Sequence, residues 1–329
     1  MMERNRTIDI LKGICMLFII INHSSWEETE RLRLLFPFTV TMAVPILMFI
    51  SGFPNARSFE KKQIVSITDC YKKSVVVPRL TRLIVPFTMM YFLEVCIHLI
   101  FSPKMAYEYV LMYLCGGWGD GTYYVPVMIQ FVFSFPLIYF LIKWNKKKGL
   151  FLSFTLTLLY ELIQRAYQMN VECYTNILFR YLFLIASGCY AGLYSESNNR
   201  IHILYLIEVA VGLAFIILFS YTPYHTVIFQ DYWKSTTLLP SLFVIPIVTL
   251  ILKYINISIP FFEIIGRASF HIFLVQKVFF YGIKSGIEFD TGNQILQVLL
   301  NILCCVVVGI AFYYFERKCY RRIVRHTVE

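Results

Sequence analysis

Residues 8–25 read IDILKGICMLFIIINHSS, an apolar stretch that is long enough to cross much of a bilayer as a helix. The stretch nevertheless carries three ionisable residues, Asp9, Lys12 and His23. Ionisable side chains in a membrane helix are costly and by default indicate function. At about 100° and 1.5 Å per residue, Lys12 and His23 share one helix face about 16 Å apart, and Asp9 lies one turn before Lys12. The segment therefore predicts a membrane helix with a charged stripe.

The rest of the chain has the same apolar character. Of its 329 residues, 58% are hydrophobic and only 15% are charged, and the mean hydropathy is +0.64. A soluble domain of this length would need more charged residues to cover its surface. We therefore expect an all-α, polytopic membrane helix bundle that forms a single domain over residues 1–329, and not a soluble domain with an anchor.

Apolar segments recur along the whole chain. Each membrane-spanning helix needs about 20 predominantly apolar residues, and this requirement predicts about ten such helices. The predicted spans are 8–25, 35–54, 79–102, 122–142, 150–165, 177–194, 203–221, 236–254, 266–283 and 294–316.

The distribution of Lys and Arg predicts the orientation of the bundle. The two termini and one set of alternate loops carry 21 of these cations, whereas the other set of loops carries six. Because cytoplasmic segments are enriched in Lys and Arg, we expect a multi-pass protein of the cell membrane with both termini in the cytoplasm. The net charge of +10 then reflects topology and does not indicate a nucleic-acid partner. The six cations expected outside are Arg31, Arg33, Lys104, Arg165, Lys234 and Lys284.

The sequence PRLTRLIVP at residues 78–86 predicts the cytoplasmic start of a helix. Pro78 suits a first helical turn, where its missing N–H costs nothing. Arg79 and Arg82 are three residues apart and therefore face the same way. Free N–H groups at a helix start and two arginines together favour an anion such as phosphate. Arginines at this position are also ordinary topology signals, so both interpretations stay open.

Four segments, taken together, resemble acyltransferase family 3, a family of integral membrane proteins that modify cell-surface glycans with acetyl or other acyl groups. The resemblance covers roughly residues 4–316, and YYVP at 123–126 with Gln130 also fits it. The four segments are RTIDILKG at 6–13 leading into NHS at 22–24, VPILMFISGF at 44–53, RLTRLIVP at 79–86 and IGRASFHIFLVQ at 265–276.

The resemblance implies that His23 is the catalytic residue, because the family places a basic residue, then ten others, before its histidine. Lys12 stands where arginine is usual, which keeps the charge but loses the bidentate fork. Gln276 stands where the late helix often carries histidine. His271 in that helix is either a local substitute or, as we favour, a packed polar group.

The resemblance also implies an acetyl-CoA or other acyl-CoA donor. Its phosphates would bind near Lys12, Arg79 and Arg82 at the cytoplasmic side. A neutral His23 imidazole would then remove a proton from an acceptor hydroxyl, or would carry the acyl group covalently. We expect the residue that orients His23 to come from another helix. The candidates for substrate and oxyanion contacts at the outer level are Asn22, Ser24, Tyr123, Tyr124 and Gln130.

The resemblance thus implies a membrane O-acetyltransferase-like enzyme that acts on a polysaccharide or another exported glycan. We expect a glycan or lipid-linked saccharide acceptor, the lipid bilayer, and a homo-oligomer or a glycan-assembly partner. The nine cysteines show no metal-ligand spacing, and we expect no metal. A transporter or flippase of a glycan intermediate stays open as an alternative, although the chain shows no clear internal repeat. A membrane scaffold or sensor with a degenerate site is the third hypothesis.

Overall fold

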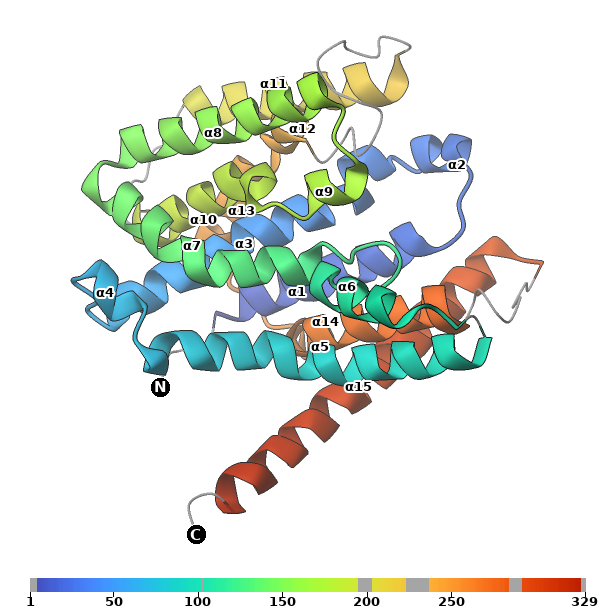
Figure 1. Ribbon diagram of the computed structural model, residues 1–329. Helices are drawn as coiled ribbons and strands as arrows, with labels where there is room; N and C mark the ends of the chain where they lie inside the picture. The colour runs from blue at the N-terminus through green and yellow to red at the C-terminus, as the bar shows by residue number, and fades with distance from the viewer. Residues whose placement is uncertain (1–4, 102, 195–202, 223–236, 284–291, 327–329) are drawn as a thin grey trace. The chain divides into compact units, whose positions relative to one another are not determined.

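The computed structural model describes residues 5–101, 103–194, 203–222, 237–283 and 292–326 of the chain (Figure 1). The described residues contain helices and no strand. Four cations used to predict the topology, Arg4, Arg200, Lys234 and Lys284, lie outside these residues.

The chain divides into two compact units, and each is assembled from separate stretches of sequence. Unit 1 comprises Met1–Ser25, Thr81–Val125 and Ile257–Glu329, and unit 2 comprises Trp26–Leu80 and Pro126–Asn256. One boundary falls inside α5 and another inside α7, because these long helices contribute residues to both units. Our expectation of a single domain stays a prediction.

Unit 1 is built around α1, which packs against α14, and α14 in turn packs against α15. Glycines permit the close approach of α1 and α14. A Cβ atom added to Gly13 would clash with the Phe262 carbonyl oxygen, and one added to Gly266 would clash with the Asp9 carbonyl oxygen. The helices of this unit are α1 (Arg6–His23), α5 (Lys73–Phe101) from Thr81 onward, α6 (Ala106–Cys115), α14 (Pro260–Lys277), the π-helical turn η6 (Val278–Ile283) and α15 (Gln294–His326).

Unit 2 is built around α3 and α10, and α10 also packs against α8. Glycines again permit the contact, because a Cβ atom at Gly52 would meet the α10 backbone and one at Gly188 would meet Phe49. Small residues permit this close approach between membrane helices. The elements are α2 (Glu28–Arg33), η1 (Phe36–Phe38), η2 (Val40–Met42), α3 (Ala43–Lys61), α4 (Ile67–Cys70), α7 (Tyr124–Trp144), α8 (Lys146–Tyr167), α9 (Val171–Thr175), η3 (Leu178–Tyr181), α10 (Leu182–Tyr194), α11 (Ile203–Tyr221), α12 (Leu238–Ser241) and α13 (Val244–Tyr254).

The described part of the chain has five helical segments that are long and apolar enough to cross a membrane. Two shorter apolar segments, Leu178–Tyr194 and Leu238–Tyr254, match two further predicted spans. The remaining predicted spans coincide with α1, α8 and α14, each of which carries at least three charged residues. The protein is therefore a polytopic helical membrane protein, as predicted. The five long segments are Phe36–Lys61, Ile67–Phe101, Tyr124–Trp144, Ile203–Tyr221 and Gln294–Cys319.

Candidate functional site

Helix α1 ends at His23, the predicted catalytic residue. The next residue, Ser24, has extended backbone angles, and its N–H donates back to the carbonyl oxygens of Ile20 and Ile21. The helix therefore stops at a fixed point, and His23 stands on its last turn. Lys12 lies eleven residues earlier on the same helix and is partly exposed.

Helix α15 anchors this end of α1. The Asn301 side-chain amide donates to the buried Ser24 hydroxyl at 3.0 Å, and the Gln297 amide donates to Asn301 Oδ1 at 3.1 Å. The Gln294 amide donates to the Ser25 carbonyl oxygen. Ser24, predicted as a substrate contact, therefore has a hydroxyl that helps to fix the end of α1.

A carboxylate faces the His23 imidazole. Asp120 Oδ2 lies 3.8 Å from His23 Nδ1, and the Tyr281 hydroxyl donates a hydrogen bond to the same carboxylate. The Phe280 ring lies against the imidazole, with 6.3 Å between the ring centroids. The His23 side chain is 11% exposed, whereas that of Asp120 is 63% exposed. The pair therefore joins an enclosed imidazole to an accessible carboxylate.

Asp120 comes from the glycine loop, which we define as residues 116–121 (GGWGDG), between α6 and α7. Its four glycines all have positive φ angles between +83° and +97°, a region that other residues avoid. Asp120 thus approaches His23 from a loop, and our expectation that the residue orienting His23 comes from another helix stays a prediction. Sequence reasoning missed Asp120, although an aspartate within four closely spaced glycines was a visible signal of a tightly folded loop.

The other predicted outer residues occupy different surroundings. Tyr123 is buried, and the Tyr124 ring packs against Phe273 of α14 with 5.1 Å between centroids. Asn22 is partly exposed on the last turn of α1. Gln130 lies in unit 2, where its amide donates to the Asn176 carbonyl oxygen at 2.6 Å and accepts from the Leu178 N–H at 3.0 Å. Its amide therefore holds the α9–η3 connection, and its role in substrate binding stays a prediction.

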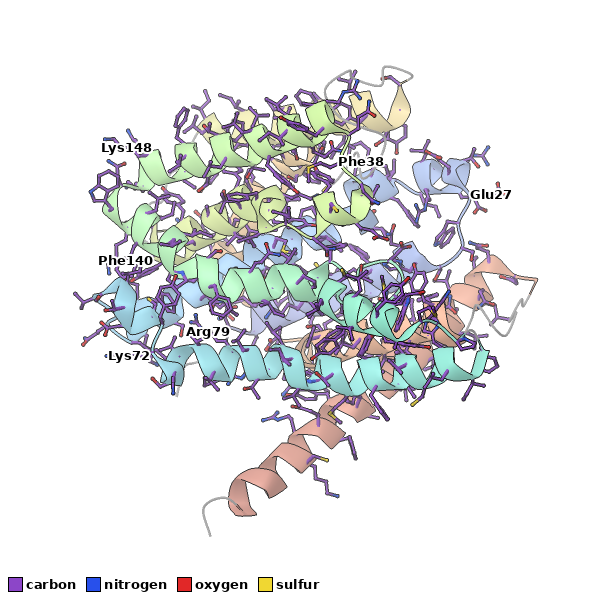
Figure 2. All side chains as sticks on the ribbon, viewed as in Figure 1. Glu27, Phe38, Lys72, Arg79, Phe140 and Lys148 are labelled. Atoms are coloured by element: carbon purple, nitrogen blue, oxygen red, sulfur yellow. The ribbon has the colours of Figure 1, made fainter. Side chains whose placement is uncertain are left out.

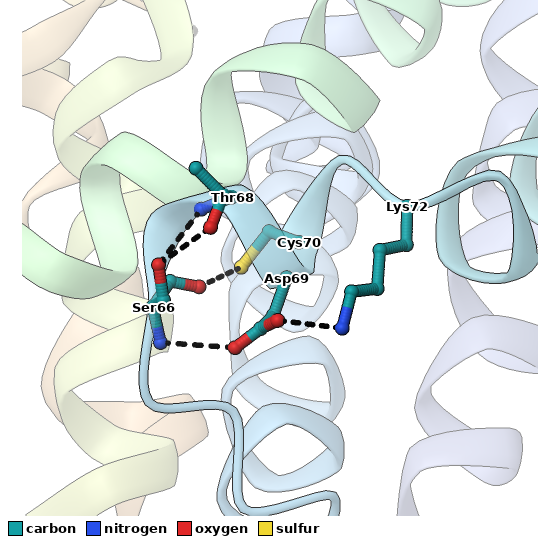
Figure 3. Close-up of polar contacts among 5 residues, drawn as sticks. All are labelled: Ser66, Thr68, Asp69, Cys70 and Lys72. Carbon is teal, nitrogen blue, oxygen red and sulfur yellow. Dashed lines mark hydrogen bonds and ion pairs between the residues drawn. The ribbon is translucent and has the colours of Figure 1, made fainter.

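The helix that carries Arg79 and Arg82 begins earlier than the sequence predicts. A capping box at Ser66 and Asp69 starts α4, and Lys72 Nζ pairs with Asp69 Oδ1 at 2.8 Å (Figure 3). Helix α5 then begins at Lys73, so the prediction that Pro78 opens the helix is wrong. The free N–H groups of the helix start therefore lie about one and a half turns before Arg79.

The two arginines nevertheless occupy consecutive turns of α5. Arg79 lies near the start of this helix, as Lys72 does, and its guanidinium lies 4.6 Å from the centroid of the Phe59 ring (Figure 2). Arg82 is three residues further on and is exposed. Any anion binding here would therefore depend on the two side chains and not on a helix N-terminus.

The late helix α14 carries the two residues at which the family resemblance is imperfect. Gln276 is fully buried, and among the described residues neither its amide nitrogen nor its amide oxygen has a hydrogen-bond partner. His271 is buried against α15, with its ring beside Phe312 and Tyr313 and its Nε2 3.5 Å from Glu316 Oε2. These contacts agree with our prediction that His271 is a packed polar group.

The family model described as an acyltransferase domain matches residues 5–314, nearly the whole chain. The chain therefore belongs to this family of membrane acyltransferases, as the four sequence segments predict. No relative was found among the curated proteins.

Proposed function

We propose that this protein moves an acyl group, most simply acetyl, from cytoplasmic acyl-CoA to a carbohydrate hydroxyl of a surface or exported glycan. One observation carries the proposal: in a chain of the acyltransferase family, one helix bears Lys12 in its first half and, at its end, His23 facing a carboxylate. The donor would be bound at the Lys12 end and the acceptor at the His23 end. Coenzyme A would thus stay on the cytoplasmic side, while its acyl group would pass to the acceptor on the other side.

His23 acts in this proposal as a general base. In the proposal the Asp120 carboxylate, which lies 3.8 Å from Nδ1, favours the proton on Nδ1, so that Nε2 takes the proton of the acceptor hydroxyl. The hydroxyl oxygen attacks the thioester carbonyl carbon, a C–O bond forms, and the C–S bond breaks. The proton then passes from Nε2 to the departing thiolate, which leaves as coenzyme A. A carboxylate beside the imidazolium would stabilise the charge that develops in the transition state.

The phosphates of coenzyme A need cations at the cytoplasmic end. Arg79 and Arg82 are suited to this role, since a guanidinium binds phosphate through two parallel hydrogen bonds. Lys12 would add a point charge on α1. The flexible pantetheine arm would carry the thioester along the face of α1 toward His23.

The proposal also covers the cellular location of the protein and its partners. The cation distribution supports a position in the cell membrane with both termini in the cytoplasm. The acceptor would be a glycan or a lipid-linked saccharide, and a second copy of the chain or a glycan-assembly protein would complete the system. The reaction as written needs no metal ion.

Purified protein, incubated with acetyl-CoA and glycan extracted from the producing cells, tests the proposal. We expect coenzyme A release that depends on the glycan, and acetylated sugar detected by mass spectrometry. Both signals should disappear in His23→Ala. The alternative is a transporter. It would be favoured if glycan crossed vesicle membranes in the absence of acetyl-CoA and no acetylated product formed.

A further inference from the structure

Unit 1 contains a buried ion pair that the proposed reaction does not use directly. Lys277 Nζ on α14 lies 3.7 Å from Glu94 Oε1 on α5, and their side chains are only 1% and 8% exposed. A buried ion pair recovers little net stability, because both charges lose their hydration. Within a membrane helix such charges indicate function by default. The pair therefore needs an explanation beyond stability.

The ion pair holds the first half of the glycine loop. The Lys277 ammonium group donates to the Gly116 carbonyl oxygen, and the Trp118 backbone N–H donates to the Glu94 carboxylate. A Cβ atom at Gly117 would lie 2.5 Å from Lys277 Nζ and 2.6 Å from Glu94 Oε2. The backbone of residues 116–118 therefore rests directly on the two charged groups, which bind one of its carbonyl oxygens and one of its N–H groups.

Trp118 provides a second attachment for the same part of the loop. Its ring stacks on Tyr91 of α5, with 5.4 Å between centroids and only 4° between the ring planes. It also contacts the His98 ring at 4.3 Å and the Tyr109 ring at 5.6 Å. Tyr109 belongs to α6, so this aromatic cluster joins the loop to both α5 and α6.

The second half of the loop carries the carboxylate to His23. Gly119 lies so close to the Tyr281 ring that a Cβ atom there would clash with it. The Tyr281 hydroxyl holds the Asp120 carboxylate, which faces His23 Nδ1 at 3.8 Å. A continuous set of contacts thus runs from the buried pair through the loop to the imidazole.

We propose that Glu94 and Lys277 are positioning residues for acyl transfer: they seat residues 116–118 so that Asp120 faces His23. This inference rests on the proposed function of His23. It assigns the pair no contact with donor or acceptor, and places its effect entirely in the orientation of the imidazole. An apolar pair would fill the same volume but would leave the Gly116 carbonyl oxygen and the Trp118 N–H without partners.

The test replaces the pair by Met at both positions (Glu94→Met with Lys277→Met), because an apolar replacement of a buried pair often preserves folding. We expect kcat to fall about 30-fold while KM for acetyl-CoA changes less than about twofold, since only an interaction that orients the base is lost. The conservative variant Glu94→Asp should recover part of kcat. The control is Lys143→Met, which breaks the partly exposed ion pair with Glu60 at 2.7 Å in unit 2 and should leave kcat unchanged.

A double-mutant cycle with Asp120→Asn separates positioning from general stability. If the pair acts through Asp120, the Met substitutions should lower kcat no further in the Asp120→Asn background. If the losses in kcat from the Met substitutions and from Asp120→Asn multiplied, this inference would be overturned. A wild-type kcat in the Met variant would overturn it too, and neither result would affect the role of His23. If the Met variant fails to fold, Lys277→Arg replaces it in the cycle. Its loss of kcat should again disappear in the Asp120→Asn background. Full activity of His23→Ala would instead reject the proposed function itself.

Discussion

Two histidines of unit 1 each face a carboxylate, but their surroundings differ. His23 Nδ1 lies 3.8 Å from Asp120, which is 63% exposed, whereas His271 Nε2 lies 3.5 Å from Glu316, which is 17% exposed. His23 ends a helix beside a loop, and His271 lies in mid-helix between aromatic rings of α15. A histidine–carboxylate pair therefore does not define a reactive site by itself. The two imidazoles are about equally enclosed, at 11% and 10% exposed, so the pairs differ in the exposure of their carboxylates.

The largest expected effect is the loss of transfer in His23→Ala. Removal of a general base costs about 10²- to 10⁴-fold in rate, so acetyl transfer should fall to background. Thermal unfolding of the purified variant should match that of the wild type, because His23 stands at a helix end. Transfer at more than about a tenth of the wild-type rate would remove the main distinction between the two histidines.

Asp120→Asn should have the next largest effect. Loss of the carboxylate removes the group that fixes the imidazole orientation and stabilises its charged form. An orienting aspartate that is buried in a hydrolase contributes about 10⁴-fold, and we expect about 10²-fold here because Asp120 is largely exposed. Steady-state kinetics should show the loss in kcat with little change in KM. A change in KM alone would indicate a contact with substrate instead of with His23.

Arg82→Ala should weaken donor binding without changing the chemistry. One charge-assisted contact to phosphate contributes about 1.5–3 kcal/mol, so KM for acetyl-CoA should rise about tenfold or more. Arg82→Lys should recover part of the affinity, since it keeps the charge but not the fork. The matched control is Lys104→Ala, which removes a cation from the opposite set of loops and should leave KM for acetyl-CoA unchanged. Equal effects of the two Ala variants would point to a general electrostatic influence.

The smallest effect on activity is expected for His271→Ala. The substitution leaves a cavity beside Phe312 and Tyr313 and should lower the free energy of unfolding by about 1–2 kcal/mol. The transfer rate per folded molecule should stay within about twofold of the wild type. A loss comparable to that of His23→Ala would show that the buried pair is also catalytic, and would contradict the comparison.

The sequence predicts the helical bundle well, because span length and apolar composition are local properties. Every predicted span coincides with described helices, and α1 carries Lys12 in its first half and His23 at its end. The start of α5 was placed wrongly at Pro78, since the helix already begins at Lys73, where the Val76 N–H donates to the Lys72 carbonyl oxygen. Pro78 suits a first helical turn, but it does not exclude an earlier start.

The residues around His23 could not be predicted from sequence alone. Glu94 and Lys277 come from α5 and α14 and Asp120 comes from the glycine loop, and only the three-dimensional fold connects these segments. Sequence patterns predict which residues share a helix face. They do not predict which helices a loop with four positive φ angles will contact. Lys277 lies within the predicted span 266–283, and its contact with the Gly116 carbonyl oxygen emerges only in three dimensions.

The central claim is that donor and acceptor react from opposite ends of α1. Proteoliposomes that hold the protein in one orientation, with labelled acetyl-CoA on the side of Arg79 and Arg82 and extracted glycan on the other, test it most directly. We predict labelled acetyl on the glycan, none when the two compartments are exchanged, and none with His23→Ala. Transfer that occurs only when acetyl-CoA and glycan share one compartment would contradict the account.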